Sequence, residues 1–223
     1  MKEHTAILIF SNSCEADSRI KKIKKGKLLF NHLNEKVVKV ALRTELPVEV
    51  ISSNEQIGSS FKERFYNAIQ HVYSKGFENV IIIGNDTPQL STQHILSAYN
   101  NLKNNKISIG PSTDGGFYLL AISKTIFQKI NFFDYSWQTQ TLLSELLNNL
   151  KNLDQDPLIL NLLADIDSID DLKTIQNYSK YFSSVFKRII SEILSISPVT
   201  FEIENFYFNS YFTKIPLNKG SPA

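Results

Sequence analysis

The chain has 223 residues, with 24 Lys and Arg against 22 Asp and Glu, and a formal net charge of +2. This near balance excludes a global field that would direct the protein to nucleic acid or to a membrane surface, and no apolar run is long enough to span a bilayer. The single cysteine, Cys14, excludes an intrachain disulfide and suits a reducing compartment. We therefore expect a cytoplasmic protein with no nucleic-acid partner and no membrane span.

The first half of the chain alternates apolar runs with amphipathic segments. A short run that is apolar throughout indicates a strand covered on both faces, and apolar residues at helical spacing indicate the inner face of a helix. We therefore predict strands at residues 5–10, 48–51 and 80–83 and helices at residues 28–42 and 61–76. A polar and basic segment, residues 11–27, separates the first strand from the first helix.

The second half continues this alternation. We predict strands at residues 107–109, 117–122 and 158–160, and helices at residues 91–104, at residues 139–150 and from Ser168 onward. Strands that alternate with helices favour an α/β fold, with a mostly parallel sheet in a three-layer α/β/α arrangement.

The C-terminal region, residues 179–223, is predicted to follow a main domain of residues 1–178. It holds a predicted helix with a wide apolar face ending near Ile193, and then a tail rich in aromatic residues. The tail aromatics are Phe201, Phe206, Tyr207, Phe208, Tyr211 and Phe212. Because a free tail would leave this apolar surface in water, we predict that it packs on the domain or on a partner, including a second copy in a homo-oligomer.

Asp86 is the first candidate site residue. It follows the apolar run Ile81–Ile83 just past the predicted strand, and ligands of open α/β sheets bind beyond the carboxyl ends of the strands. Hard cations such as Mg²⁺ are held by one or two carboxylates together with the phosphates of a substrate. The alternative is a turn acid, because Asp-Thr-Pro also begins a turn into a helix.

The turn Asp114-Gly115-Gly116 is the second candidate. Adjacent glycines permit positive φ and allow the backbone to approach a ligand closely. The flanking Gly110-Pro111 and the aromatic pair Phe117-Tyr118 favour a ligand site. The alternative is a plain hairpin turn, since Asp-Gly is the strongest short hairpin signal.

Asp165 and Asp167 form a further acidic pair. Two residues apart, they lie on one side of the chain if the segment is extended. Such a pair would complete a metal shell or hold a hydroxyl-rich substrate. Trp137 would stack on a sugar or form a pocket wall, with ordinary core packing as the alternative.

Arg19, Lys21 and Lys22 belong to the basic segment after the first strand. The phosphates of a nucleotide would lie there in such a sheet, and Arg and Lys would neutralise a diphosphate. The alternative is a solvated loop.

Taken together, the segments Ile83–Pro88, Gly110–Tyr118, Trp137–Thr139 and Asp165–Asp167 resemble a known family in their order and spacing. It is the bacterial glycosyltransferase-like family of the GT-A, or nucleotide-diphospho-sugar transferase, fold, some of whose members are associated with arsenosugar biosynthesis. The resemblance covers about residues 50–175. Relatives usually carry a Pro-Gly-x-x-Lys-Thr-Arg-Leu-like phosphate loop after the first strand, whereas residues 11–25 lack the Pro, the Gly and the Lys-Thr-Arg.

The resemblance implies a nucleotide-sugar donor over the ends of the first strands, with Mg²⁺ or Mn²⁺ as cofactor. The implied metal ligands are Asp86, Asp165 and Asp167. The groups implied near the transferred sugar or its acceptor are Asp114, Gly115, Gly116 and Trp137. In an inverting reaction Asp114 would act as general base to the acceptor hydroxyl.

Three functions are compatible with these residues. The first is a metal-dependent glycosyltransferase that moves a sugar from a nucleotide-diphospho-sugar to an acceptor. The second is a nucleotidyltransferase on the same fold, which would release pyrophosphate. The third is a non-catalytic scaffold, which the altered phosphate loop motivates.

Overall fold

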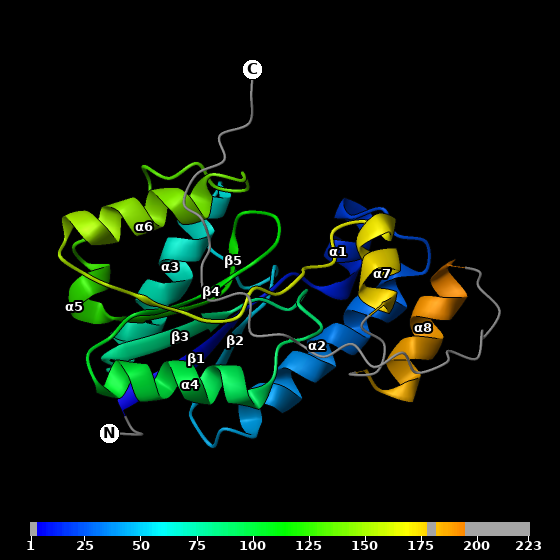
Figure 1. The fold of residues 1–223 in the computed structure, drawn as a ribbon, viewed down its shortest axis with the longest axis horizontal. Coiled ribbons are helices and arrows are strands. Elements are labelled where there is room, and N and C mark those ends of the chain that lie inside the picture. Colours follow the sequence, from blue (N-terminus) through cyan, green and yellow to red (C-terminus); the bar gives the residue numbers. More distant parts are fainter. Residues whose placement is uncertain (1–3, 178–181, 195–223) are drawn as a thin grey trace.

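The structure, a computed structural model, describes residues 4–177 and 182–194. Its centre is a six-stranded sheet with the strand order β2-β1-β3-β5-β4-β6 (Figure 1). The strands are β1 (Thr5–Phe10), β2 (Val48–Ile51), β3 (Asn79–Ile83), β4 (Ser108–Pro111), β5 (Phe117–Ser123) and β6 (Leu158–Ile159).

The sheet is mixed but mostly parallel. β1 pairs in parallel with β2 and β3, and β4 pairs in parallel with β6, whereas β5 is antiparallel to both β3 and β4. The predicted α/β class and mostly parallel sheet are confirmed. β5 runs the other way because a short turn joins it to β4, and such a turn can only join antiparallel neighbours.

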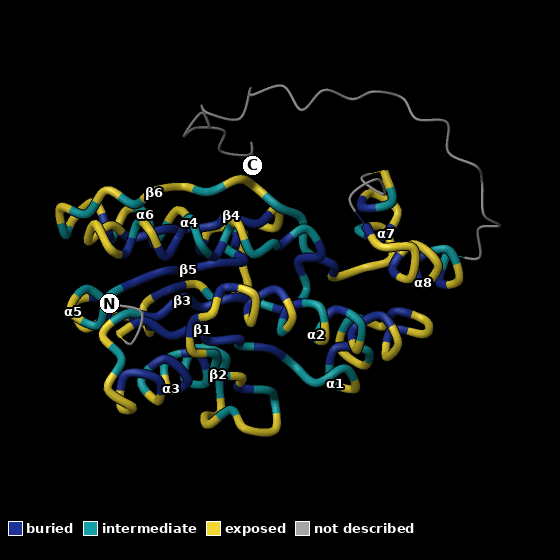
Figure 2. Tube along the Cα trace, turned by 90° about the horizontal axis from the view of Figure 1, so that it is seen from below, coloured by how far each residue is buried: buried dark blue, intermediate teal, exposed yellow. Residues whose placement is uncertain are grey.

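Helices cover both faces of the sheet. One face carries α3 (Phe61–Ser74), α5 (Lys124–Phe127) and α6 (Leu142–Asn152), and the other carries α2 (Gly26–Leu42) and α4 (Thr92–Lys103). Ala6 and Leu8 of β1 pack into the first layer, and Ile7 and Ile9 pack into the second. Because both faces are covered, the central strands are apolar along most of their length and largely buried (Figure 2). The predicted three layers are therefore confirmed.

Helix boundaries follow local capping. Ser60 and Glu63 form a capping box at the start of α3, and Ser168 and Asp171 form one at the start of α7 (Ile169–Gln176). The predicted helix at residues 139–150 begins later, at Leu142, because the preceding residues form turns that include Gln138 at φ 62°.

The basic segment after β1 is mostly helical, which the sequence did not predict. It forms α1 (Cys14–Ile20), whose N-cap Ser13 accepts a hydrogen bond from the backbone of Ala16, and it continues into the start of α2. Lys22 and Lys25 in the connection between the helices have positive φ.

The described part of the C-terminal region packs on the main body. α8 (Ser184–Leu194) shares a hydrophobic cluster with α7 and with the first half of α2. The cluster includes Leu29, Phe30, Leu33, Ile166, Leu172, Ile175, Phe186, Ile189 and Ile190. The predicted tail, residues 198–223, and the boundary at residues 178–179 lie outside the described residues, so both stay predictions. No described helix has the length and apolar character needed to cross a membrane.

Candidate functional site

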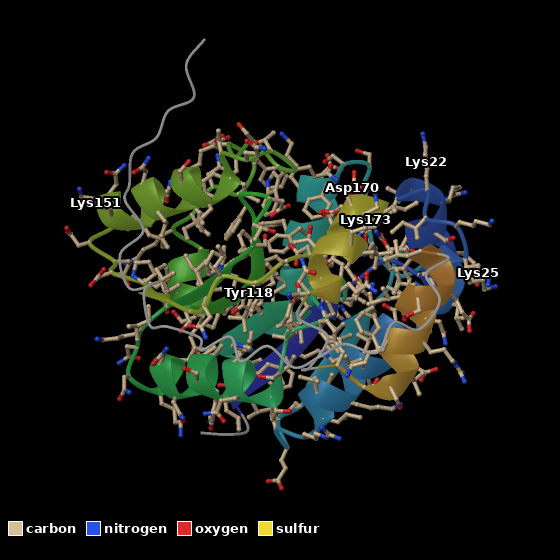
Figure 3. All side chains as sticks on the ribbon, turned by 45° about the vertical axis from the view of Figure 1, so that its right-hand side comes forward. Lys22, Lys25, Tyr118, Lys151, Asp170 and Lys173 are labelled. Atoms are coloured by element: carbon tan, nitrogen blue, oxygen red, sulfur yellow. The ribbon has the colours of Figure 1, made fainter. Side chains whose placement is uncertain are left out.

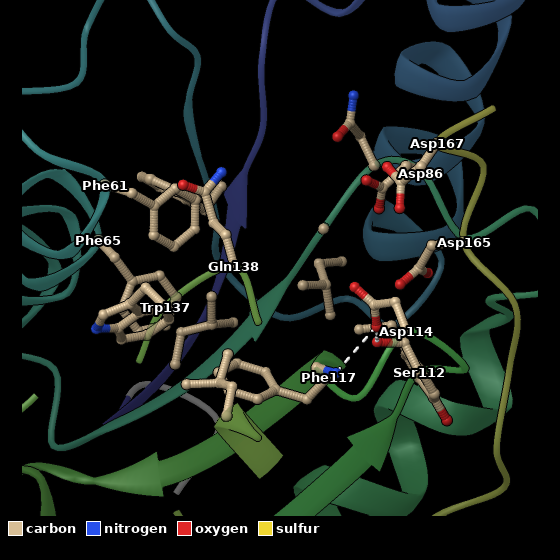
Figure 4. Close-up of a pocket in the computed structure, with 18 of the residues that line it drawn as sticks. Phe61, Phe65, Asp86, Ser112, Asp114, Phe117, Trp137, Gln138, Asp165 and Asp167 are labelled. Atoms are coloured by element: carbon tan, nitrogen blue, oxygen red, sulfur yellow. Dashed lines mark hydrogen bonds between the residues drawn. The ribbon is translucent and has the colours of Figure 1, made fainter. Parts of the chain in front are cut away.

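A cavity of about 590 Å³ opens at the carboxyl edge of β1, β3 and β4. Residues that follow these strands line it, together with the start of β5, the loop before α6 and the segment after β6. This volume and this edge of an α/β sheet are both typical of small-molecule sites. Aromatic side chains gather at one end of the cavity and carboxylates at the other (Figure 4).

The carboxylate end brings together two segments that are distant in sequence. Asp86 follows β3, and its backbone carbonyl accepts a hydrogen bond from the backbone N–H of Ile166 at 3.0 Å. Residues 158–163 run along β4 with parallel pairing, which delivers Asp165 and Asp167 to the same edge. The three acids of the predicted metal site are therefore neighbours (Figure 4).

Lys21 lies between two of these three acids, Asp86 and Asp167. Its ammonium lies 2.8 Å from Asp86 Oδ2 and 2.9 Å from Asp167 Oδ1, and it donates to the backbone carbonyl of Ile166 at 2.8 Å. The side chain is 9% exposed. Burial alone lowers the pKa of Lys21, but the charges of Asp86 and Asp167 outweigh it and raise that pKa above its ordinary value. Lys21 is therefore a charged, buried bridge between two of the predicted ligands.

Asp165, the third acid of this group, is half-buried. The hydroxyl of Thr87 donates to its Oδ1. Burial first, and then the charge of Asp86, raise the pKa of Asp165 well above its ordinary value. The raised pKa favours the neutral, protonated form of Asp165.

The Asp114 turn forms a hairpin, which is one of the two alternatives raised by the sequence, and it also lines the cavity, while its role as a ligand site stays a prediction. It joins β4 to β5, and Asp114 Oδ1 accepts from the backbone of Gly116 at 2.9 Å and from the hydroxyl of Ser112. Gly115 has φ +90°, and a Cβ there would lie 2.3 Å from the backbone oxygen of Gln140. The close approach at Gly115 is therefore to the chain itself, whereas Gly116 lines the cavity.

Trp137 anchors the aromatic end. Its indole N–H donates to the backbone carbonyl of Phe132 at 2.7 Å, and its ring lies 4.7 Å from Phe65 and 5.2 Å from Phe61 between centroids. Phe117 completes the group at the start of β5. These rings adjoin the core on the α3 side of the sheet, so Trp137 is at once a pocket wall and part of the packing.

Of the three predicted phosphate-binding residues, only Lys21 reaches the site. Arg19 is exposed and lines a separate shallow depression with Ser13, Ser53 and Asn54. Lys22 is exposed, and its side chain points away from the body of the molecule (Figure 3). None of the three residues lines the cavity itself, and Lys21 meets the site through its contacts with Asp86, Asp167 and the Ile166 carbonyl.

A buried polar network beneath the carboxylate end was not predicted. Asp17 of α1 is 1% exposed and accepts from Asn12 Nδ2 at 2.8 Å and from Asn85 Nδ2 at 3.0 Å. Asn85 also donates to Asn34 of α2 at 2.6 Å. In the sequence, Asp17 is an acid inside a basic segment and Asn85 is an amide just before Asp86. Nothing in the residues around either one indicates that the two side chains meet.

As arranged, the predicted ligands do not fit a divalent cation. Ligation requires free carboxylate oxygens directed at one point, whereas Lys21 holds one oxygen of Asp86 and one of Asp167. Within the described ranges, no group of three or more His, Cys, Asp and Glu side chains is arranged to hold a metal ion.

The comparisons with known proteins agree with this architecture. Residues 30–139 match the model of a family described as "Uncharacterized protein conserved in bacteria (DUF2064)", a match that includes the Asp86 and Asp114 segments. The structure is similar to that of a "putative nucleotide-diphospho-sugar transferase" from Desulfovibrio desulfuricans G20, with TM-score 0.75 and 19% identity. That similarity covers 87% of this chain and 96% of the other.

Two more solved structures match at lower TM-scores. Rv0371c from Mycobacterium tuberculosis H37Rv, in complex with manganese, has TM-score 0.47 and 11% identity over 77% of this chain and 97% of its own. The 4-diphosphocytidyl-2C-methyl-D-erythritol synthase from Anaerococcus prevotii DSM 20548 has TM-score 0.45 and 12% identity over 81% and 100%. No curated protein matches the chain. At these identities the similarity shows the fold alone, which is similar to that of the protein from Desulfovibrio desulfuricans G20.

Proposed function

We propose that the cavity binds a nucleotide-diphospho-sugar and that the protein transfers the sugar to an acceptor hydroxyl. The observation that carries the proposal is the pairing of the Asp114 carboxylate with the Trp137 wall in one cavity at the carboxyl edge of the sheet. The fold adds support, because it is similar over most of its length to a protein described as such a transferase.

In an inverting transfer, Asp114 would act as general base. The acceptor oxygen would form a bond to the anomeric carbon while the bond from that carbon to the diphosphate breaks, and the acceptor proton would pass to Asp114. The hydrogen bonds from Gly116 and Ser112 hold the Asp114 carboxylate in place. Trp137 and Phe117 would offer ring faces to the apolar side of the acceptor.

The donor diphosphate raises a charge problem. The described residues that line the cavity include Asp86, Asp114, Asp165 and Asp167, and none of them is Lys or Arg. A nucleoside diphosphate gains negative charge as it leaves, and positive groups must offset that charge. Lys21 holds one oxygen of Asp86 and one of Asp167. The predicted Mg²⁺ or Mn²⁺, with Asp86, Asp165 and Asp167 as ligands, therefore stays a prediction, and no step of the transfer is assigned to it.

The test begins with a thermal-shift panel of nucleotide-diphospho-sugars and nucleoside triphosphates. A ligand at about one hundred times its dissociation constant stabilises a protein by about 2.7 kcal/mol, so a donor will be visible. With that donor and candidate acceptors, release of nucleoside diphosphate supports the proposal. Release of pyrophosphate from a triphosphate would identify a nucleotidyltransferase instead, and no ligand response at all would leave the scaffold function.

Asp114→Asn then tests the assigned base. We expect turnover to fall by about 10²- to 10⁴-fold while donor binding is kept, because the amide preserves the shape but cannot accept the proton. Asp156→Asn, an exposed acid outside the cavity lining, is the matched control. Full activity in Asp114→Asn would remove this residue from the mechanism. The predicted cytoplasmic location rests on the sequence alone and stays a prediction.

A further inference from the structure

Lys21 places a cation where the sequence predicts a divalent metal. An ammonium group has three N–H donors and no acceptor, and Lys21 Nζ has three acceptors within 2.9 Å: Asp86 Oδ2, Asp167 Oδ1 and the carbonyl of Ile166. Its hydrogen-bonding capacity is therefore filled by this site. A buried charge is tolerated only when it is paired and hydrogen-bonded in this way.

The backbone fixes the direction from which Lys21 enters. Lys21 is the C-cap of α1, and its N–H donates to the carbonyl of Asp17 at 2.8 Å. From there the side chain passes across the ring of Phe30 in α2, with Nζ 5.2 Å from the ring centroid. Phe30 is fully buried and belongs to the cluster that joins α2, α7 and α8. Packing thus guides the ammonium to the two acids.

The surrounding charges favour this position. Asp17 and Asp86 act on Lys21 from the α1 and β3 sides, and Asp167 acts from the segment before α7. Asp86 and Asp167 are far apart in the sequence but close together in the structure. The ammonium between them offsets the repulsion between the two carboxylates.

We propose that the Lys21 ammonium is the resident cation of Asp86 and Asp167, and that a divalent cation binds this carboxylate pair only by displacing Lys21. The proposal concerns the protein alone and does not depend on sugar transfer. It makes Lys21 the residue that sets the cation preference of the site, with low affinity for Mg²⁺ and Mn²⁺ in the unliganded protein.

The test is a calorimetric titration of Mn²⁺ into wild type, Lys21→Met and Lys24→Met, without nucleotide. Methionine removes the ammonium but keeps a long side chain to pack on Phe30, and Lys24 is an exposed neighbour for the control. We expect Lys21→Met to bind Mn²⁺ more tightly than wild type by about tenfold or more, which is about 1.4 kcal/mol. Lys24→Met should match wild type, and adding Asp86→Asn to Lys21→Met should remove the gain.

Equal or weaker Mn²⁺ binding in Lys21→Met would overturn the proposal. If that variant does not fold, acetylation of wild type followed by mass spectrometry decides the question. A resident Lys21 should react more slowly than Lys24 by about tenfold or more, since its charged and buried amine resists deprotonation. Equal reaction rates would overturn the proposal. A failed sugar-transfer assay leaves both measurements unaffected.

Discussion

The two ends of the cavity are built by different forces. At the aromatic end, Phe65 is 4% exposed and lies within 6.2 Å, between centroids, of five other aromatic rings. At the carboxylate end, Asp86 and Asp167 are partly exposed and depend on Lys21 and on hydrogen bonds. The aromatic wall is thus an extension of the core, whereas the acids are held by polar contacts and charge. Changes of volume should damage the first end, and changes of charge or hydrogen bonding should damage the second.

The largest effect is expected at the aromatic end. Phe65→Ala should lower the free energy of unfolding by about 3–5 kcal/mol, because it removes a buried ring and leaves a void. Urea denaturation would measure it. Phe133→Ala, at a ring that is 38% exposed, is the control and should cost about 1 kcal/mol or less. If Phe65→Ala lowers the free energy of unfolding no more than Phe133→Ala does, the aromatic end is not part of the core.

The Asp114 turn offers a test of backbone shape. Gly115→Ala should cost about 2–4 kcal/mol, because φ +90° is unfavourable for Ala and the new Cβ meets the backbone of Gln140. Gly76 has φ +96°, and a Cβ added there would meet nothing within 4 Å. The difference in unfolding free energy between Gly115→Ala and Gly76→Ala therefore isolates the contact with Gln140. If the two variants have the same free energy of unfolding, the loop before α6 can move away from the new Cβ at no measurable cost.

The buried network supports the carboxylate end through hydrogen bonds. Asp17→Asn should destabilise by about 1–3 kcal/mol, because an amide has one acceptor oxygen and the Asn12 and Asn85 amides need two. Thermal denaturation would measure the loss. Asp170→Asn, at an exposed acid, is the control. An unchanged melting temperature in Asp17→Asn would mean that the network contributes little to the position of Asn85 and Asp86.

The smallest expected effect is a dependence on pH. Lys36 of α2 donates to the carbonyls of Pro88 and Leu90 below the Asp86 turn, and burial lowers its pKa to about 8. The unfolded chain keeps an ordinary lysine pKa of about 10.4, so between these values the native state binds fewer protons than the unfolded state. Stability contributed by Lys36 should therefore rise as pH increases from about 8 to about 10.4.

If the whole difference in pKa between the folded and unfolded states contributed, the free energy of unfolding would rise by about 3 kcal/mol. Because the carbonyls of Pro88 and Leu90 favour the charged form of Lys36, we expect a rise of about 1–2 kcal/mol. The measurement is urea denaturation across this pH range for wild type and Lys36→Met. The variant should lack the rise, while other titrating groups affect both proteins alike. Parallel pH profiles would show that Lys36 keeps its charge in the folded protein.

Much of the architecture could be predicted because local patterns determine it. The apolar runs at β1 and β3 reflect burial on both faces, and the start of α7 follows from Ser168 and Asp171 as a capping box. Asp86 and the Asp114 turn could be singled out because each stands at the end of such a run. These features depend on neighbouring residues, so their sequence patterns are visible without a fold.

The geometry of the site was decided by tertiary structure. Nothing near Lys21 in the sequence indicates that its ammonium bridges Asp86 and Asp167, or that Arg19 and Lys22 point elsewhere. The chain alone therefore determined which residue types stand at the ends of its strands. Only the folded structure decided which of them meet, because the distances between side chains on different elements depend on packing and pairing across the whole sheet rather than on spacing along the chain.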